Sequence, residues 1–184
     1  TVLALDDGIL WVATAAGLAS ADVRINDWQT YALPGETRAL AFDDKYVWAG
    51  GDSGLRRFDK YAETWTVRSG IPVNDLFAEK GLLWIATTAG VLRWDTRYDR
   101  VDEMPAPPDT YDLIINTPSR VWFAGRKKLV AYNKTAGSWA GYGLLRIEDF
   151  ATLGDSVLVT SHGSRFIYEP GADEQVWKSE DQMG

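Results

Sequence analysis

The chain has 184 residues, a formal net charge of -7, 9 Trp, 8 Tyr and no Cys. This length predicts one compact domain, and the acidic balance, with no run of Lys or Arg longer than Lys127-Lys128, argues against a nucleic-acid partner. The lack of Cys excludes disulfides and thiol chemistry, and no apolar stretch reaches the roughly 20 residues that would cross a bilayer.

A five-residue pattern whose second position is tryptophan in four copies recurs along the chain. The copies are Leu10–Thr14, Val47–Gly51, Leu83–Thr87, Val121–Gly125 and Val157–Ser161. Their second positions, here called the marker positions, are residues 11, 48, 84, 122 and 158, which lie 37, 36, 38 and 36 residues apart. This near-constant interval indicates an internal repeat whose five copies fill the chain.

Each copy holds three further strand-like runs in the same register. The run before the marker contains an apolar residue, namely Leu3, Leu40, Leu76, Ile114 or Phe150. The run after it opens at Gly17, Gly54, Gly90, Lys128 or Ser164, and it ends on Ala21-Asp22, Phe58-Asp59, Trp94-Asp95, Tyr132-Asn133 or Tyr168-Glu169. The outermost run carries Trp28, Trp65, Val101 or Trp139, with Trp177 displaced in the fifth copy.

Turn residues such as Asp7-Gly8 and Lys80-Gly81 separate the runs, so each copy predicts four short antiparallel strands. In the second copy the predicted strands are Arg38 to Phe42, Tyr46 to Gly50, Leu55 to Phe58 and Thr64 to Arg68. Four strands in about 37 residues without a helix are typical of a propeller blade. We therefore predict an all-β fold, a β-propeller of five four-stranded antiparallel blades, with a stacked β-solenoid as the alternative.

The predicted blades cover residues 1–36, 37–72, 73–109, 110–146 and 147–184 of one domain. The sequence leaves open whether five blades close into a ring, belong to a larger ring in a longer chain, or are completed by another copy of the chain. An open set of blades would expose apolar faces and associate.

The segment Leu83 to Asp95, with Pro72-Val73-Asn74-Asp75-Leu76 before it, resembles the two-component regulator propeller repeat of bacterial sensor proteins. The resemblance covers the whole chain and weakens in the last two copies, where Lys128 and Ser164 replace the glycine. It implies a ligand-sensing propeller in the periplasm or outside the cell, often one that binds glycans, although the chain shows no signal-peptide pattern. It implies no catalytic residue, and it describes blade architecture rather than function.

The tryptophans at four marker positions, Trp11, Trp48, Trp84 and Trp122, invite two interpretations. Indole rings stack on sugars, but a ring that recurs at one strand position in nearly every copy is what packing between blades requires. We therefore predict a structural role between blades for these four residues. For Trp28, Trp65 and Trp139 on the outer strand we also favour a core position over a ligand contact.

A binding site is expected where the copies differ within loops that share one face. Four residues after the marker the copies carry Ala15, Asp52, Thr88, Arg126 and His162, on the turn between the second and third strands. The inner strands add Arg38, Asp75, Asp112 and Asp149, which could line a central channel. These side chains are the candidate ligand-binding residues, against the alternative that they only solvate surface turns and a water-filled channel.

Other chemistry finds little support in the sequence. There is one histidine, no cysteine and no calcium-binding loop motif, so no metal site or cofactor is predicted, with calcium among the channel carboxylates as the alternative. Asp75 and Asp149 could serve as a glycosidase pair, but facing carboxylates also arise from the repeat alone. We predict a non-enzymatic module that binds a glycan or peptide, with a scaffold for protein partners as the alternative.

Overall fold

The computed structural model describes residues 2–14, 17–25, 27–32, 35–143, 147–168 and 178–179. All regular structure within these ranges is β-strand, in five antiparallel sheets of strands consecutive in sequence. In these ranges no helix is long and apolar enough to span a membrane. The prediction of an all-β chain with five antiparallel sheets is confirmed.

Each sheet takes its strands in chain order from one edge to the other. Sheet 1 is β1 (Val2–Asp6), β2 (Ile9–Thr14), β3 (Gly17–Asp22) and β4 (Asp27–Tyr31). Sheet 2 is β5 (Ala39–Phe42), β6 (Tyr46–Gly51), β7 (Gly54–Asp59) and β8 (Thr64–Ser69). Sheet 3 is β9 (Val73–Glu79), β10 (Leu82–Thr87), β11 (Gly90–Asp95) and β12 (Arg100–Glu103). Sheet 4 is β13 (Tyr111–Asn116), β14 (Arg120–Gly125), β15 (Leu129–Asn133) and β16 (Ser138–Tyr142). Sheet 5 is β17 (Ile147–Leu153), β18 (Ser156–Ser161), β19 (Ser164–Tyr168) and β20 (Lys178–Ser179).

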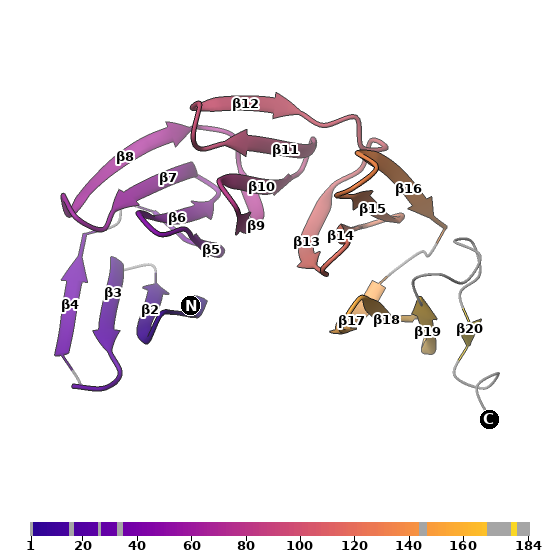
Figure 1. Ribbon diagram of the computed structural model, residues 1–184, viewed down its shortest axis with the longest axis horizontal. Coiled ribbons are helices and arrows are strands. Elements are labelled where there is room, and N and C mark those ends of the chain that lie inside the picture. Colours follow the sequence, from indigo (N-terminus) through magenta and orange to yellow (C-terminus); the bar gives the residue numbers. More distant parts are fainter. Residues whose placement is uncertain are drawn as a thin grey trace.

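The five sheets follow one another along an open arc, with their first strands on its inner side and their fourth strands on its outer side (Figure 1). Sheet 1 and sheet 5 lie at opposite ends of this arc. The arrangement is propeller-like, and the arc is not closed. The fifth sheet departs from the predicted four full strands, because its fourth strand has only two described residues and the predicted Trp177 lies outside the described residues.

The marker tryptophans are buried between consecutive sheets, with exposed fractions of 5% or less. Each contacts the aromatic ring that ends the third strand of the next sheet. The ring pairs and centroid distances are Trp11–Phe58 at 6.1 Å, Trp48–Trp94 at 5.7 Å, Trp84–Tyr132 at 4.9 Å and Trp122–Tyr168 at 4.9 Å. These offset and edge contacts add to a buried area of about 150–250 Å² per ring, so this column supplies much of the core.

The outer-strand tryptophans behave differently from one another. Trp65 packs on Phe58 at 5.1 Å and Trp139 on Tyr132 at 5.3 Å, and both are partly buried. Trp28 is 53% exposed, so the prediction that it belongs to the core is wrong. Trp65 and Trp139 each pack on an aromatic ring of the neighbouring third strand in their own sheet. In sheet 1 the residue opposite Trp28 on the third strand is Ala21, which offers no ring.

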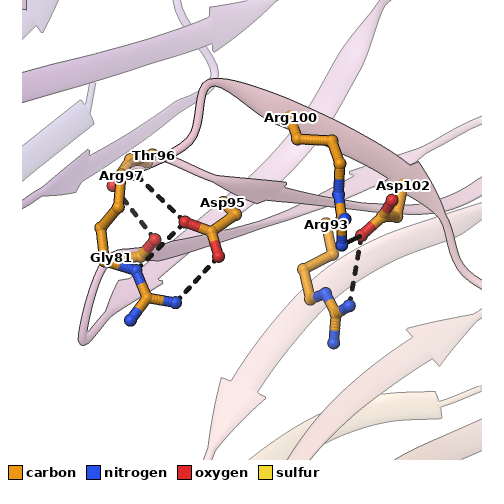
Figure 2. A network of polar contacts seen from close by, with 7 residues as sticks. All are labelled: Gly81, Arg93, Asp95, Thr96, Arg97, Arg100 and Asp102. Carbon is orange, nitrogen blue, oxygen red and sulfur yellow. Dashed lines mark hydrogen bonds and ion pairs between the residues drawn. The ribbon is translucent and has the colours of Figure 1, made fainter.

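The Asp or Asn at the end of the third strand forms the turn into the fourth strand in sheets 1 to 4. In four sheets its side-chain oxygen accepts the backbone N–H two residues later, in the pairs Asp22–Arg24, Asp59–Tyr61, Asp95–Arg97 and Asn133–Thr135. This is the Asx-turn for which Asp and Asn are favoured. Figure 2 shows the third copy, where Arg97 also binds the Asp95 carboxylate and Thr96 donates to the Gly81 carbonyl. The repeated acid is therefore structural.

Candidate binding face

The candidate residues that follow the marker positions lie on the turns between the second and third strands of sheets 2 to 5. Asp52, Thr88, Arg126 and His162 are all exposed there, and Ala15 of the first copy lies outside the described residues. His162 has φ +51° and precedes Gly163 at φ +73°, so it occupies the first left-handed position of a tight hairpin. The residues that differ between copies therefore present their side chains to solvent.

The structure joins two pairs of candidate residues across neighbouring segments. Arg38 Nη2 donates to Asp52 Oδ2 at 2.7 Å, beside the turn of sheet 2. Arg126 Nε lies 3.6 Å from Asp112 Oδ2 in sheet 4. Both pairs are largely exposed, so they contribute little to stability. Their charged groups remain accessible to a ligand, and we call the surface formed by Arg38, Asp52, Asp112 and Arg126 the paired-charge face.

Asp75 on β9 has a different role. Its Oδ1 accepts the Leu76 N–H at 2.8 Å, and its Oδ2 accepts the Ile114 N–H of β13 at 2.7 Å. Burial raises the pKa of the Asp75 carboxyl, an effect opposed by these two backbone hydrogen bonds. The side chain thus links sheet 3 to sheet 4, and both of its oxygens already accept protein hydrogen bonds.

The remaining candidates lie apart from these contacts. Asp149 Oδ1 accepts the N–H of its neighbour Phe150 at 2.9 Å. The Thr88 carbonyl accepts the Thr110 hydroxyl at 3.2 Å, which ties the turn of sheet 3 to the start of sheet 4. The eight candidates are therefore distributed over sheets 2 to 5, and four of them form the two ion pairs.

Bulges in the inner strands decide which side chains reach this face. The registers of β9, β13 and β17 shift past Asn74, Asp112 and Glu148 respectively. A bulge re-aims a side chain, and the three residues make contacts beyond their own strand. Asn74 Nδ2 donates to the Tyr111 carbonyl at 2.8 Å and lies 3.4 Å from Asp112 Oδ1, and Glu148 Oε2 accepts the Gly163 N–H at 3.1 Å. Asn74 and Glu148 are not among the candidate residues predicted from the sequence.

The chemistry available at this face is hydrogen bonding and charge pairing. In the described part of the chain, no three His, Asp or Glu side chains are grouped closely enough to hold a metal ion. Asp75, one member of the glycosidase pair considered from the sequence, accepts the Ile114 N–H of the next sheet. Guanidinium and carboxylate groups in exposed pairs suit ligands rich in hydroxyl, amide or carboxylate groups.

Comparison of the sequence with protein-family models and with curated proteins finds no match. Solved structures do match the fold. The extracellular domain of BT4673 from B. thetaiotaomicron, described as a one component system, has a TM-score of 0.79 at 16% identity, with 97% of this chain and 27% of that chain covered. The extracellular domain of BT3049 from the same organism, described as a hybrid two component system, has a TM-score of 0.73 at 15% identity over 96% of this chain and 27% of that chain.

PorZ, a surface component of the type-IX secretion system of Porphyromonas gingivalis, has a TM-score of 0.69 at 13% identity over 97% of this chain and 25% of that chain. Likeness at this identity shows a shared fold. The chain spans about a quarter of the length of these solved structures. The neighbours from regulatory systems are consistent with the resemblance to the two-component regulator propeller repeat.

Proposed function

We propose that the chain is a non-catalytic sensing or binding module of propeller blades, which recognises a glycan or a short peptide on the paired-charge face. The observation that carries this proposal is the pairing of Arg38 with Asp52 and of Arg126 with Asp112 at turns that differ between copies. The tryptophan and turn-acid columns, in contrast, are occupied by packing and turn formation. Extracellular domains among the structural neighbours support a periplasmic or extracellular location.

A glycan array followed by titration calorimetry tests this proposal. Arg126→Ala should weaken binding of the ligand that the array identifies by about tenfold, since a hydrogen bond to a charged group contributes about 1.5–3 kcal/mol. Arg100→Ala is the matched control, because its side chain is 68% exposed against 70% for Arg126 and it also pairs with an aspartate. Figure 2 shows Arg100 and Arg93 on Asp102 in the outer half of sheet 3. Equal losses for both variants would contradict a site on the paired-charge face.

A scaffold role for protein partners is the second candidate. It is favoured by the exposed apolar side chains at the ends of the arc, Leu3 and Leu5 on β1 and Leu153 on β17. Exposed apolar surface of this kind marks contact sites for protein. Pull-down from a native extract that returns one stoichiometric protein, together with an empty glycan array, would favour this candidate over the first. Additional blades or a second copy of the chain would cover the same surface.

A further inference from the structure

Two columns of the repeat fill the space between consecutive sheets, and both change at the same interface. The residue twenty positions after the marker, on the fourth strand or directly after it, is Tyr31, Arg68, Met104 or Tyr142 in sheets 1 to 4. The residue seventeen positions after the marker is Trp28, Trp65, Val101 or Trp139. Sheet 2 thus presents an arginine where sheets 1 and 4 present a tyrosine, and sheet 3 presents a valine where the other three present a tryptophan.

Aromatic rings occupy these places at the neighbouring interfaces. Between sheets 1 and 2, the rings of Tyr31 and Trp65 lie 4.5 and 5.1 Å from the ring of Phe58. Between sheets 3 and 4, Trp139 lies 5.3 Å from Tyr132, and Met104 packs against the same cluster. In both cases, side chains on or next to the fourth strands of the two sheets pack in the cluster that holds the third-strand aromatic ring of the later sheet.

Between sheets 2 and 3 the corresponding third-strand ring is Trp94, and its neighbours are Arg68 and Val101. The Arg68 guanidinium lies 4.7 Å from the centroid of the Trp94 ring. Val101 is too short to cover the rest of the ring, and it is itself 45% exposed. A cavity of about 210 Å³ remains, with a largely apolar lining that includes Leu55, Ile71, Ile85 and Leu92 as well as Trp94 and Val101.

This cavity has the size and lining of a site for an aromatic molecule. An apolar cavity of about 150 Å³ holds one benzene ring, so the larger volume here accommodates a one- or two-ring compound. Val101 stands where an indole would otherwise lie, so a planar ring of that size would replace a contact that the fold makes elsewhere. Aromatic ring pairs stabilise each other beyond the apolar area that they bury.

Arg68 supplies one polar group at the wall of the cavity. Its Nη2 bonds the Asp99 carboxylate, which also accepts the Trp94 Nε1–H at 3.2 Å. Its Nε is buried, and within the described ranges it has no hydrogen-bond partner. The Arg68 side chain as a whole is 18% exposed, so the accessible part of its guanidinium can donate a hydrogen bond to an oxygen atom of a ligand.

We propose that the cavity between sheets 2 and 3 binds a small aromatic molecule of one or two rings that carries an oxygen acceptor. The ring lies against Trp94 and Val101, and the oxygen accepts a hydrogen bond from the Arg68 guanidinium. This site is separate from the paired-charge face, and it does not depend on the function proposed for that face.

Indole serves as the probe of the ring site, with binding followed by titration calorimetry and by ligand-observed NMR. Wild type should bind indole saturably. Val101→Trp should reduce the affinity at least tenfold and raise the melting temperature, because the new side chain fills the cavity. Val67→Trp is the matched control, since Val67 lies on the neighbouring strand β8 and is 70% exposed, and it should bind as wild type does. Arg126→Ala should also leave indole binding unchanged, which separates this site from the paired-charge face.

Arg68→Tyr closes the cavity from the other sheet and should also abolish indole binding, which keeps the proposal testable if Val101→Trp does not fold. Indole-3-acetate should bind wild type about tenfold more tightly than indole, as expected for a hydrogen bond to a charged group. Arg68→Met, which places the residue of sheet 3 in sheet 2, should remove that preference. No saturable binding of indole by wild type, or unchanged binding by folded Val101→Trp and Arg68→Tyr, would overturn the proposal.

Discussion

Replacement of Asp75 by alanine is expected to loosen the junction between sheets 3 and 4. The Asp75 carboxylate accepts the Ile114 N–H at 2.7 Å and the Leu76 N–H at 2.8 Å. Loss of both acceptors leaves two backbone donors without partners, and a buried unsatisfied donor costs about 1–3 kcal/mol. Removal of a partly buried charge offsets part of this cost. We expect a net loss of about 2 kcal/mol, or about 4–8 °C in melting temperature for a chain of this length.

Thermal and urea unfolding followed by circular dichroism measure this change, with Asp149→Ala as the matched control. Asp149 occupies the same column in sheet 5, but its Oδ1 accepts the N–H of its own neighbour Phe150 rather than one from another sheet. Its replacement should therefore change the melting temperature little. Equal effects of the two substitutions would refute the assignment of Asp75 as a link between sheets.

The pH dependence provides a second test of Asp75. Burial raises the pKa of its carboxyl above the ordinary value of 3.8, so the folded chain binds this proton more tightly than the unfolded chain does. The corresponding contribution to stability is present below pH 3.8 and is lost as the pH rises through the folded-state pKa. The stability of wild type relative to Asp75→Ala should therefore increase as the pH is lowered from 6 to 4. An unchanged difference would contradict the raised pKa.

Three further predictions concern the structural columns. Trp48→Ala should destabilise the chain by about 3–5 kcal/mol in urea unfolding, because Trp48 is fully buried, whereas Trp28→Ala at its 53% exposed position should cost under about 1 kcal/mol. A hydrogen bond from the Arg24 guanidinium lowers the pKa of Asp22 to about 2. The stability that this pair adds to the folded chain should therefore be lost as the pH falls from about 4 to 2. In Arg24→Ala, the pKa of Asp22 measured by NMR titration should rise toward 3.8. Gly51→Ala should lower the melting temperature, because a Cβ there would lie 2.0 Å from a backbone carbonyl oxygen.

The strands and the buried tryptophan column could be predicted because both depend on local patterns. In sheet 2 the observed strands Ala39–Phe42, Tyr46–Gly51, Gly54–Asp59 and Thr64–Ser69 differ from the predicted ones by one residue at most at each end. Side chains alternate across a strand with a period of two, and turn residues mark where the chain reverses. Neither rule needs any knowledge of distant contacts. The division of the chain into blades of a single domain stays a prediction.

The contacts of the candidate site could not be predicted in the same way, because they depend on register. Arg38 pairs with Asp52 because β5 and β6 lie side by side, and Asp75 reaches Ile114 in a different sheet. The bulge at Asp112 shifts the alternation of β13 by one residue, and simple periodicity assigns no residue to a bulge. The channel of carboxylates expected from the inner strands therefore stays a prediction, and the structure adds that one of these carboxylates is engaged between sheets.

The repeat itself gives a physical reason to look for ligands where the copies differ. A side chain that recurs in every copy serves a structural role that recurs in every copy, namely the packing of one sheet on the next or the formation of a turn. A single bound molecule contacts only the sheets beside it, so its contacts are expected at positions where the residue differs from the other copies of the repeat. The paired-charge face and the cavity beside Trp94 both meet this criterion. The cavity meets this criterion twice. Arg68 on sheet 2 and Val101 on sheet 3 each differ from the residue that recurs at that position in other copies, and both line the cavity. Both residues lie on strands, β8 and β12, so free variation of exposed turns does not explain their departure from the repeat.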